Sequence, residues 1–156
     1  MFNCLRHPSR EHFLAKAVLG SELLLWLVWL PIMLRIQTIP LLLKRLAGSE
    51  AHVKKTPMEL IEAIGIVTRV CNLSMFRSRI FPKPCLRQSL TLYRTLNQMG
   101  YPVEIHFGVR KNDKNFQGHC WVTIRGESVA DTAADEHFKV VYSYPEARAR
   151  LDLSSL

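Results

Sequence analysis

The sequence predicts an α+β domain in which a cysteine-bearing helix packs on a small antiparallel sheet. Behind Cys85, apolar residues recur at steps of three and four, which is the periodicity of an amphipathic helix. From Val103 to Arg110 apolar and polar residues alternate, as they do in a half-buried strand. A second alternating segment, 117–123, follows a polar turn at 111–115, so the two segments are expected to form a hairpin.

The N-terminal third differs in character from the rest of the chain. We interpret residues 1–55 as a helical N-terminal region, which covers the sheet or docks a partner protein, and residues 56–156 as the core domain. Trp26 and Trp29 stand three residues apart in this region and fit a core or partner-docking face of a helix.

A run of twelve apolar residues, 23–34, dominates this region, and a short helix is expected before it at 12–19. The run is shorter than the roughly 20 residues that span a bilayer, so it fits a buried core helix or an interfacial segment better. A secretory signal is an alternative because basic residues precede the run. However, no small-residue cleavage site follows it and Glu22 lies at its edge.

The first helix of the core is expected at 57–71. Thr56 and Glu59 match a capping box, and Pro57 suits the first helical position. One apolar face is formed by Met58, Ile61, Ile64, Val67 and Cys71.

The next helix is expected at 85–99, with Pro84 at its start and Gly100 at its end. Cys85 then lies in the first turn, where free N–H groups and the positive end of the helix dipole stabilise a thiolate. The alternative is that Cys85 is a small buried apolar residue, as free cysteines usually are. The basic residues are Arg77, Arg79, Lys83 and Arg87. They lower the pKa of Cys85, attract a substrate carboxylate, or form a solvated loop.

The hairpin supplies a histidine. Along the second strand His119, Trp121 and Thr123 share one face, and Cys120 and Val122 share the other. A three-residue loop, Ile124 to Gly126, would pair Thr123 with Glu127 and therefore place His119 and Asp131 on one face, whereas a two-residue loop would separate them. The alternative is a surface histidine and a strand-end aspartate with no joint role. One more strand is expected at 138–144.

Composition limits the partners. A net charge of +8 favours an acidic partner, and no arginine-rich tract or basic and aromatic alternation suggests nucleic acid. The four cysteines, Cys4, Cys71, Cys85 and Cys120, form no C-x-x-C pair, which indicates a cytoplasmic protein. We expect no cofactor and no metal, because His119 and Cys120 point to opposite strand faces and the usual ligand spacings are absent.

The segment CLRQSLTLYRTLNQMGYPVEIHFGVRKNDKNFQGHCWVTIRGESVAD resembles the transglutaminase-like cysteine protease domain of lasso-peptide biosynthesis, the stand-alone B-type leader peptidase. The shared features are a Cys-Leu helix start, a glycine before the first strand, a Gly-Val strand end, a His-x-Trp-Val strand and a downstream aspartate. They cover residues 60–140 well. Cys120 stands where this family commonly has alanine.

The resemblance implies a papain-like or transglutaminase-like fold and a bacterial enzyme of antibiotic biosynthesis that removes the leader from a ribosomally made precursor peptide. The triad would be Cys85 as nucleophile, His119 as base and Asp131 as the group that orients the base. Trp121 would shield this pair or line the peptide groove, or simply pack. The implied partners are the precursor peptide, a separate leader-recognition protein and an asparagine-synthetase-like macrolactam cyclase.

Two other functions stay open. The same fold would support a transglutaminase-like acyltransferase, in which an amine replaces water as the acceptor. The second alternative is a noncatalytic module that binds peptides or a membrane surface, although we do not expect membrane contact.

Overall fold

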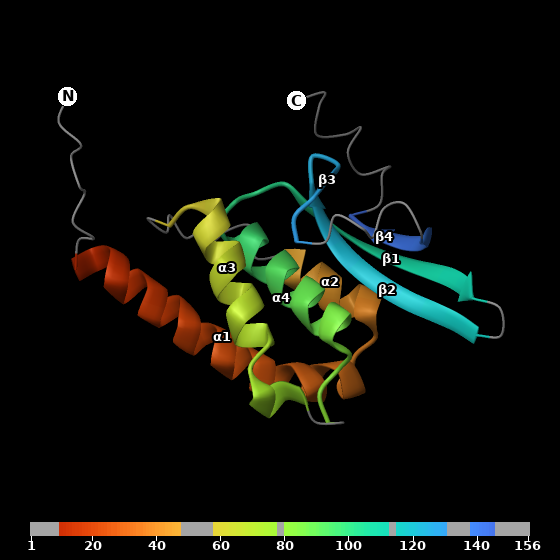
Figure 1. Ribbon diagram of the computed structural model, residues 1–156, viewed down its shortest axis with the longest axis horizontal. Coiled ribbons are helices and arrows are strands. Elements are labelled where there is room, and N and C mark those ends of the chain that lie inside the picture. The colour runs from red at the N-terminus through yellow and green to blue at the C-terminus, as the bar shows by residue number, and fades with distance from the viewer. Residues whose placement is uncertain (1–9, 48–57, 78–79, 113–114, 131–137, 146–156) are drawn as a thin grey trace.

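The computed structural model describes residues 10–47, 58–77, 80–112, 115–130 and 138–145. It contains four α-helices and a four-stranded antiparallel sheet of order β3-β2-β1-β4 within these residues. Helix α4 lies between the sheet and the other helices, contacting β1 and β2 on one side and α1, α2 and α3 on the other (Figure 1). The predicted α+β class is confirmed.

The first helix, α1, spans Arg10–Ile36 and is followed by α2, Ile39–Ala47. The separate segments expected at 12–19 and 23–34 form one continuous helix, because a single glycine inside a helix costs only about 1 kcal/mol relative to alanine and Gly20 does not break it. Pro31 also lies inside α1. Leu23, Leu27 and Leu30 are fully buried against the rest of the domain.

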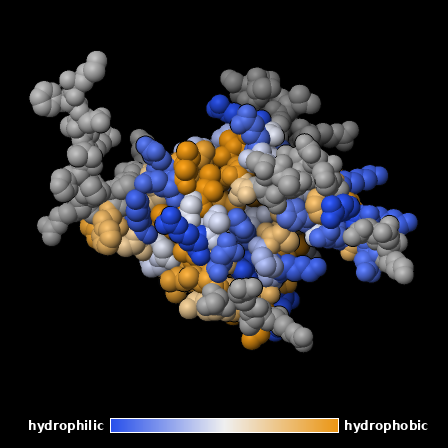
Figure 2. Space-filling model, in the orientation of Figure 1, coloured by the Kyte–Doolittle hydropathy of each residue, from blue (hydrophilic) through white to orange (hydrophobic). Residues whose placement is uncertain are grey.

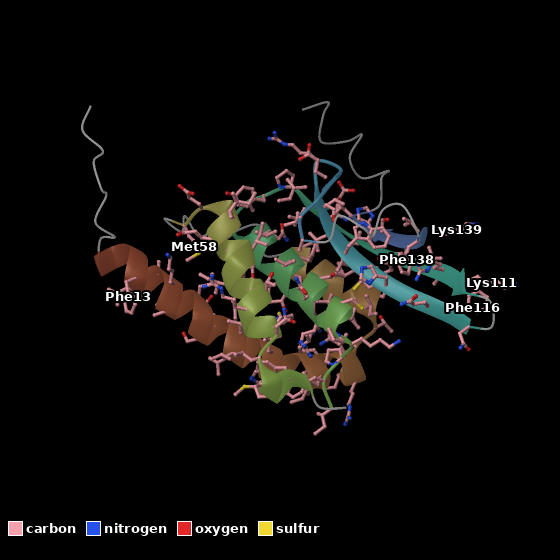
Figure 3. The ribbon with its side chains drawn as sticks, viewed as in Figure 1. Phe13, Met58, Lys111, Phe116, Phe138 and Lys139 are labelled. Atoms are coloured by element: carbon pink, nitrogen blue, oxygen red, sulfur yellow. The ribbon has the colours of Figure 1, made fainter. Side chains whose placement is uncertain are left out.

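The opposite side of α1 is exposed and apolar. It carries Leu14, Val18, Leu25, Val28, Trp29 and Ile32. Figure 3 shows Phe13, which is 72% exposed, at the outer end of the helix. Within the described residues Phe13–Ile36 is the one helix long and apolar enough to cross a membrane, a property that core helices and signal sequences share.

Helix α3 spans Leu60–Cys71, so the helix predicted from residue 57 begins three residues later. Glu59 is extended and forms the N-cap without a side-chain bond, so the predicted capping box is wrong. Thr56 and Pro57, and the proposed domain boundary at 55/56, lie outside the described residues. A short 3₁₀ helix, Ser74–Arg77, follows.

Helix α4 spans Pro84–Gln98, which confirms the prediction to within one residue at each end. Pro84 occupies the first turn, and Gly100 has a φ of 83° beyond the C-terminus, where the Tyr101 N–H donates to the Leu96 carbonyl over 3.0 Å. Leu90, Leu92, Tyr93 and Leu96 are buried, and they join α1, α2 and α3 to the sheet in one apolar core.

The sheet is built on a long hairpin. Strands β1, Val103–Asn112, and β2, Asn115–Ile124, pair along their whole length, so the turn is shorter than the five residues predicted. Strand β3, Glu127–Ser128, pairs with β2, and β4, Lys139–Tyr144, pairs with β1. The predicted strand at 138–144 is therefore confirmed. Apolar side chains gather over the helices, whereas the hairpin end is mostly hydrophilic (Figure 2).

Candidate active site

Cys85 lies in the first turn of α4, as predicted. The first helical hydrogen bond runs from the Arg87 N–H to the Lys83 carbonyl over 3.0 Å. The N–H groups of Cys85 and Leu86 precede it and have no carbonyl partner in the helix. The Leu86 N–H instead hydrogen-bonds to the Cys85 sulfur. The start of the helix therefore provides donors for negative charge.

Two neighbouring residues of β2 reach Cys85. His119 and Cys120 both hydrogen-bond to its sulfur, although their side chains point to opposite faces of the strand. Strand β3 pairs with β2 only from Thr123 onward, so the β2 backbone at these two residues forms an edge of the described sheet. A thiol beside that edge can contact side chains from both faces.

These contacts lower the pKa of Cys85 from 9.0 to about 5. The largest cause is the hydrogen bond from the Cys120 thiol, and the electrostatic interaction and hydrogen bond with His119 act in the same direction. Partial burial opposes them by disfavouring the charged form. Cys85 is thus a thiolate at neutral pH, which is the reactive form of cysteine.

Aromatic rings hold His119 in place. Its ring stacks on Trp121 with centroids 6.1 Å apart and lies 5.0 Å from the ring of Phe138, which Figure 3 shows beside the sheet at the start of β4. Trp121 also stacks on His106, with ring centroids 5.5 Å apart. His106 is itself fixed by Ser143 at 2.8 Å and Thr123 at 2.9 Å.

A cleft of about 250 Å³ opens at Cys85. Besides Cys85 it is lined by Gln88, Ser89, Leu92, His119, Cys120, Trp121, Val122 and Ala130. Trp121 lines the cleft, but it is only 3% exposed, so most of its side chain packs inside the domain. Gln88 and Ser89 were not predicted from the sequence, although their positions one turn after Cys85 would have suggested them.

The register that was expected to join His119 to Asp131 is wrong. Ile124 pairs with Glu127 and Thr123 with Ser128 across a two-residue loop. Arg125 and Gly126 both have positive φ, 53° and 87°, as this tight turn requires, so an arginine occupies a conformation that the prediction reserved for glycine. Asp131 lies outside the described residues, and its role stays a prediction.

Arg87 belongs to the group of basic residues for which a solvated loop was one alternative, and its side chain is not solvated. This side chain is 2% exposed and donates to the carbonyl oxygens of Phe76 at 2.5 Å, Cys71 at 2.7 Å and Pro82 at 3.4 Å. Arg87 therefore fastens the segment between α3 and α4. Lys83 is exposed, and the side chains of Arg77 and Arg79 lie outside the described set. Within that set no group of three or more His, Cys, Asp or Glu residues could hold a metal ion.

A low-pKa thiol at a helix start, beside a histidine on an antiparallel sheet, is the arrangement used by cysteine-dependent acyl-transfer enzymes. A family model described as "Transglutaminase-like superfamily" matches residues 26–143. The chain therefore belongs to this superfamily, which includes cysteine proteases and acyltransferases. No curated protein and no solved structure matches the chain.

Proposed function

We propose that this protein is a cysteine peptidase that removes the leader from a lasso-peptide precursor. The observation that carries the peptidase assignment is the Cys85 thiolate at the start of α4, in contact with His119 and open to a cleft. A buried, inert thiol would have a raised pKa, as Cys71 does because of its burial. This contrast argues against the noncatalytic module.

In the proposed reaction the Cys85 thiolate attacks the scissile carbonyl carbon. His119 delivers its proton to the leaving amine, which leaves a thioester on Cys85. Water then attacks the thioester while His119 accepts the water proton, and the released acid frees the thiolate. The proposed role of Asp131 is to hold the His119 ring in the productive tautomer.

The oxyanion of the tetrahedral intermediate needs donors near the sulfur. We assign the Cys85 backbone N–H as one of them, since it precedes the first helical hydrogen bond and has no partner within α4. Trp121 is proposed to border the bound peptide, because it lines the cleft beside His119.

The precursor assignment depends on the resemblance of the segment 85–131 to B-type leader peptidases. In this proposal the substrate is the precursor peptide, and a separate leader-recognition protein and an asparagine-synthetase-like cyclase act with the peptidase in the cytoplasm. The net charge of +8 suits an acidic peptide segment.

The exposed side of α1 is the proposed docking surface for the leader-recognition protein. Leu25, Val28 and Trp29 are each more than half exposed there, which is unusual for such large apolar side chains in one face. Trp29→Glu should abolish co-purification with that protein, whereas Ile61→Glu, which changes an exposed apolar residue on α3, should not. Binding of the wild-type protein to anionic vesicles but not to the recognition protein, or equal co-purification of the two variants, would contradict this assignment.

A second candidate activity follows from superfamily membership, because the superfamily includes acyltransferases. Both activities form the same thioester, and they differ in whether water or an amine attacks it. Adding a primary amine during the reaction and weighing the products distinguishes a free acid from an amide.

The direct test incubates a lasso-type precursor peptide with the leader-recognition protein and this protein, as wild type, Cys85→Ala or Cys71→Ala. The expected result is cleavage by the wild type and by Cys71→Ala, and none by Cys85→Ala. Cleavage that survives Cys85→Ala would overturn the mechanism.

A further inference from the structure

The candidate site contains a second thiol that forms or breaks no bond in the proposed peptide hydrolysis. Cys85 is on α4 and Cys120 is on β2, yet the two thiols hydrogen-bond to each other and both line the cleft. They are 35 residues apart in the sequence, so the tertiary fold alone brings them together.

The packing between α4 and β2 fixes this pair. The Ser89 hydroxyl donates a 2.8 Å hydrogen bond to the backbone carbonyl of Cys120. Ser89 follows Cys85 by four residues, so the two lie on the same face of α4, one turn apart. The bond therefore holds the β2 backbone against the helix next to the reactive thiol. A disulfide would replace the hydrogen bond between the two thiols with a bond of about 2.05 Å.

The two thiols differ in accessibility and in protonation. Cys120 is 4% exposed, whereas Cys85 is partly exposed at the cleft. The pKa of Cys120 is raised by its hydrogen bond to Cys85 and by burial, so it keeps its proton when Cys85 is ionised. An oxidant entering from solvent therefore meets the Cys85 thiolate first, and Cys120 reacts only with what forms on Cys85.

We propose that Cys85 and Cys120 form a reversible redox pair, in which a hydroperoxide oxidises Cys85 and Cys120 then closes a disulfide with it. In the first step the Cys85 sulfur attacks a peroxide oxygen and the O–O bond breaks. Sulfur loses two electrons to become a sulfenic acid, and the peroxide leaves as water or an alcohol after taking up a proton. In the second step the Cys120 sulfur attacks the Cys85 sulfur, the S–O bond breaks, and the thiol proton leaves with the hydroxyl group as water.

The disulfide has two consequences for the protein. It occupies the nucleophile, so the enzyme is inactive while oxidised. It also stops the oxidation of Cys85 before the sulfinic and sulfonic acids, which thiols do not reduce. A dithiol returns two electrons and two protons and restores both cysteines.

The test treats the intact protein with hydrogen peroxide, blocks free thiols and maps the tryptic peptides by mass. The expected product joins peptide 80–87, which holds Cys85, to peptide 115–125, which holds Cys120, at about 2 Da below the summed masses. Dithiothreitol should separate them. This measurement does not depend on the natural substrate, so its failure and the failure of the peptidase proposal are distinguishable.

Two variants provide the comparison. Cys71→Ala removes a buried thiol on α3 and should leave the linked peptides unchanged. Cys120→Ala should give no linked peptide and should accumulate sulfinic and sulfonic acid on Cys85. The share of Cys85 that iodoacetamide labels after peroxide and dithiothreitol, relative to the same protein before peroxide, should be at least about fivefold lower than for the wild type. Wild-type protein that yields no 85–120 link, or a Cys120→Ala variant that recovers Cys85 equally well, would overturn the proposal.

Discussion

The indole of Trp121 lies against the Cα of Gly108, and a Cβ at that glycine would be 2.8 Å from Trp121 Cζ3. The same Cβ would be 2.9 Å from the Cβ of Phe138. Gly108 also pairs with His119 across the hairpin. The absence of a side chain on β1 therefore lets two aromatic rings support the candidate base on β2.

The first prediction concerns this glycine. Gly108→Ala should displace Trp121 and Phe138, cost about 1 to 3 kcal/mol of stability through overpacking, and lower the rate of Cys85 alkylation at pH 6 by disturbing His119. Urea denaturation and iodoacetamide labelling measure the two effects. Gly118→Ala is the control, because a Cβ there meets nothing within 4 Å. Equal behaviour of the two variants would contradict the packing role of Gly108.

The second prediction concerns the pH dependence of Cys85. Its pKa is lowered to about 5, so the thiolate fraction should be nearly complete at pH 7 and should be lost as the pH falls through about 5. Alkylation rates measured from pH 4 to 9 should follow this curve at Cys85. A midpoint near 9 would contradict it.

The third prediction concerns the largest cause of that lowered pKa. Cys120→Ala removes the thiol donor and should raise the midpoint of the Cys85 alkylation profile. Alkylation at pH 5 should slow by about fivefold for the first pH unit by which the midpoint rises and by about tenfold for each further unit, because the thiolate fraction falls by those factors. Cys120→Ser keeps a hydrogen-bond donor and should raise the midpoint less. If both substitutions leave the profile unchanged, the Cys120 thiol does not stabilise the thiolate.

The fourth prediction concerns Arg87. Arg87→Ala should lower the free energy of unfolding by about 3 kcal/mol, because two buried carbonyl groups and one partly buried carbonyl group lose a charged donor. Arg87→Lys should recover only part of this loss, since one ammonium group cannot reach carbonyls in several directions. Lys83→Ala, an exposed change in the same segment, should stay within about 0.5 kcal/mol of the wild type. Thermal denaturation of the four proteins provides the measurement.

The fifth prediction separates the two tryptophans of α1. The Trp26 indole N–H donates to the Thr91 hydroxyl over 3.2 Å, and the Arg94 guanidinium lies 5.0 Å from the ring centroid. Trp26→Phe should therefore destabilise the protein by about 1 to 2 kcal/mol. Trp29 is 55% exposed, so Trp29→Phe should be close to neutral in the same urea titration. A larger loss for Trp29→Phe would contradict the orientation of α1.

The parts of the fold that the sequence predicted are those with local signals. Pro84 and Gly100 delimit α4 because one fixes the first helical φ and the other accepts a left-handed conformation. The start of α3 was misjudged because Thr56 and Glu59 fit a capping box by residue type, whereas the extended backbone of Glu59 decides where the helix begins.

Only part of the candidate site could be predicted, because only part of it depends on local sequence signals. A helix start and a strand identify Cys85 and His119, and alternation correctly separates the side chains of His119 and Cys120. Alternation does not show that Cys85 lies beside the strand edge, where it touches both residues. Predicting how β2 pairs with β3 required the length of the loop between them. Arg125 hid the two-residue loop, because arginine rarely adopts the positive φ that this loop needs.

Helix α4 carries Cys85 in its first turn, and eight of its fifteen residues are buried. Its side chains contact the sheet and the three other α-helices, so its central turns cannot open without disrupting the whole domain. Amide hydrogens in the middle of α4 should therefore exchange only through global unfolding. The first turn that holds Cys85 is therefore anchored to helical turns that open only when the whole domain unfolds.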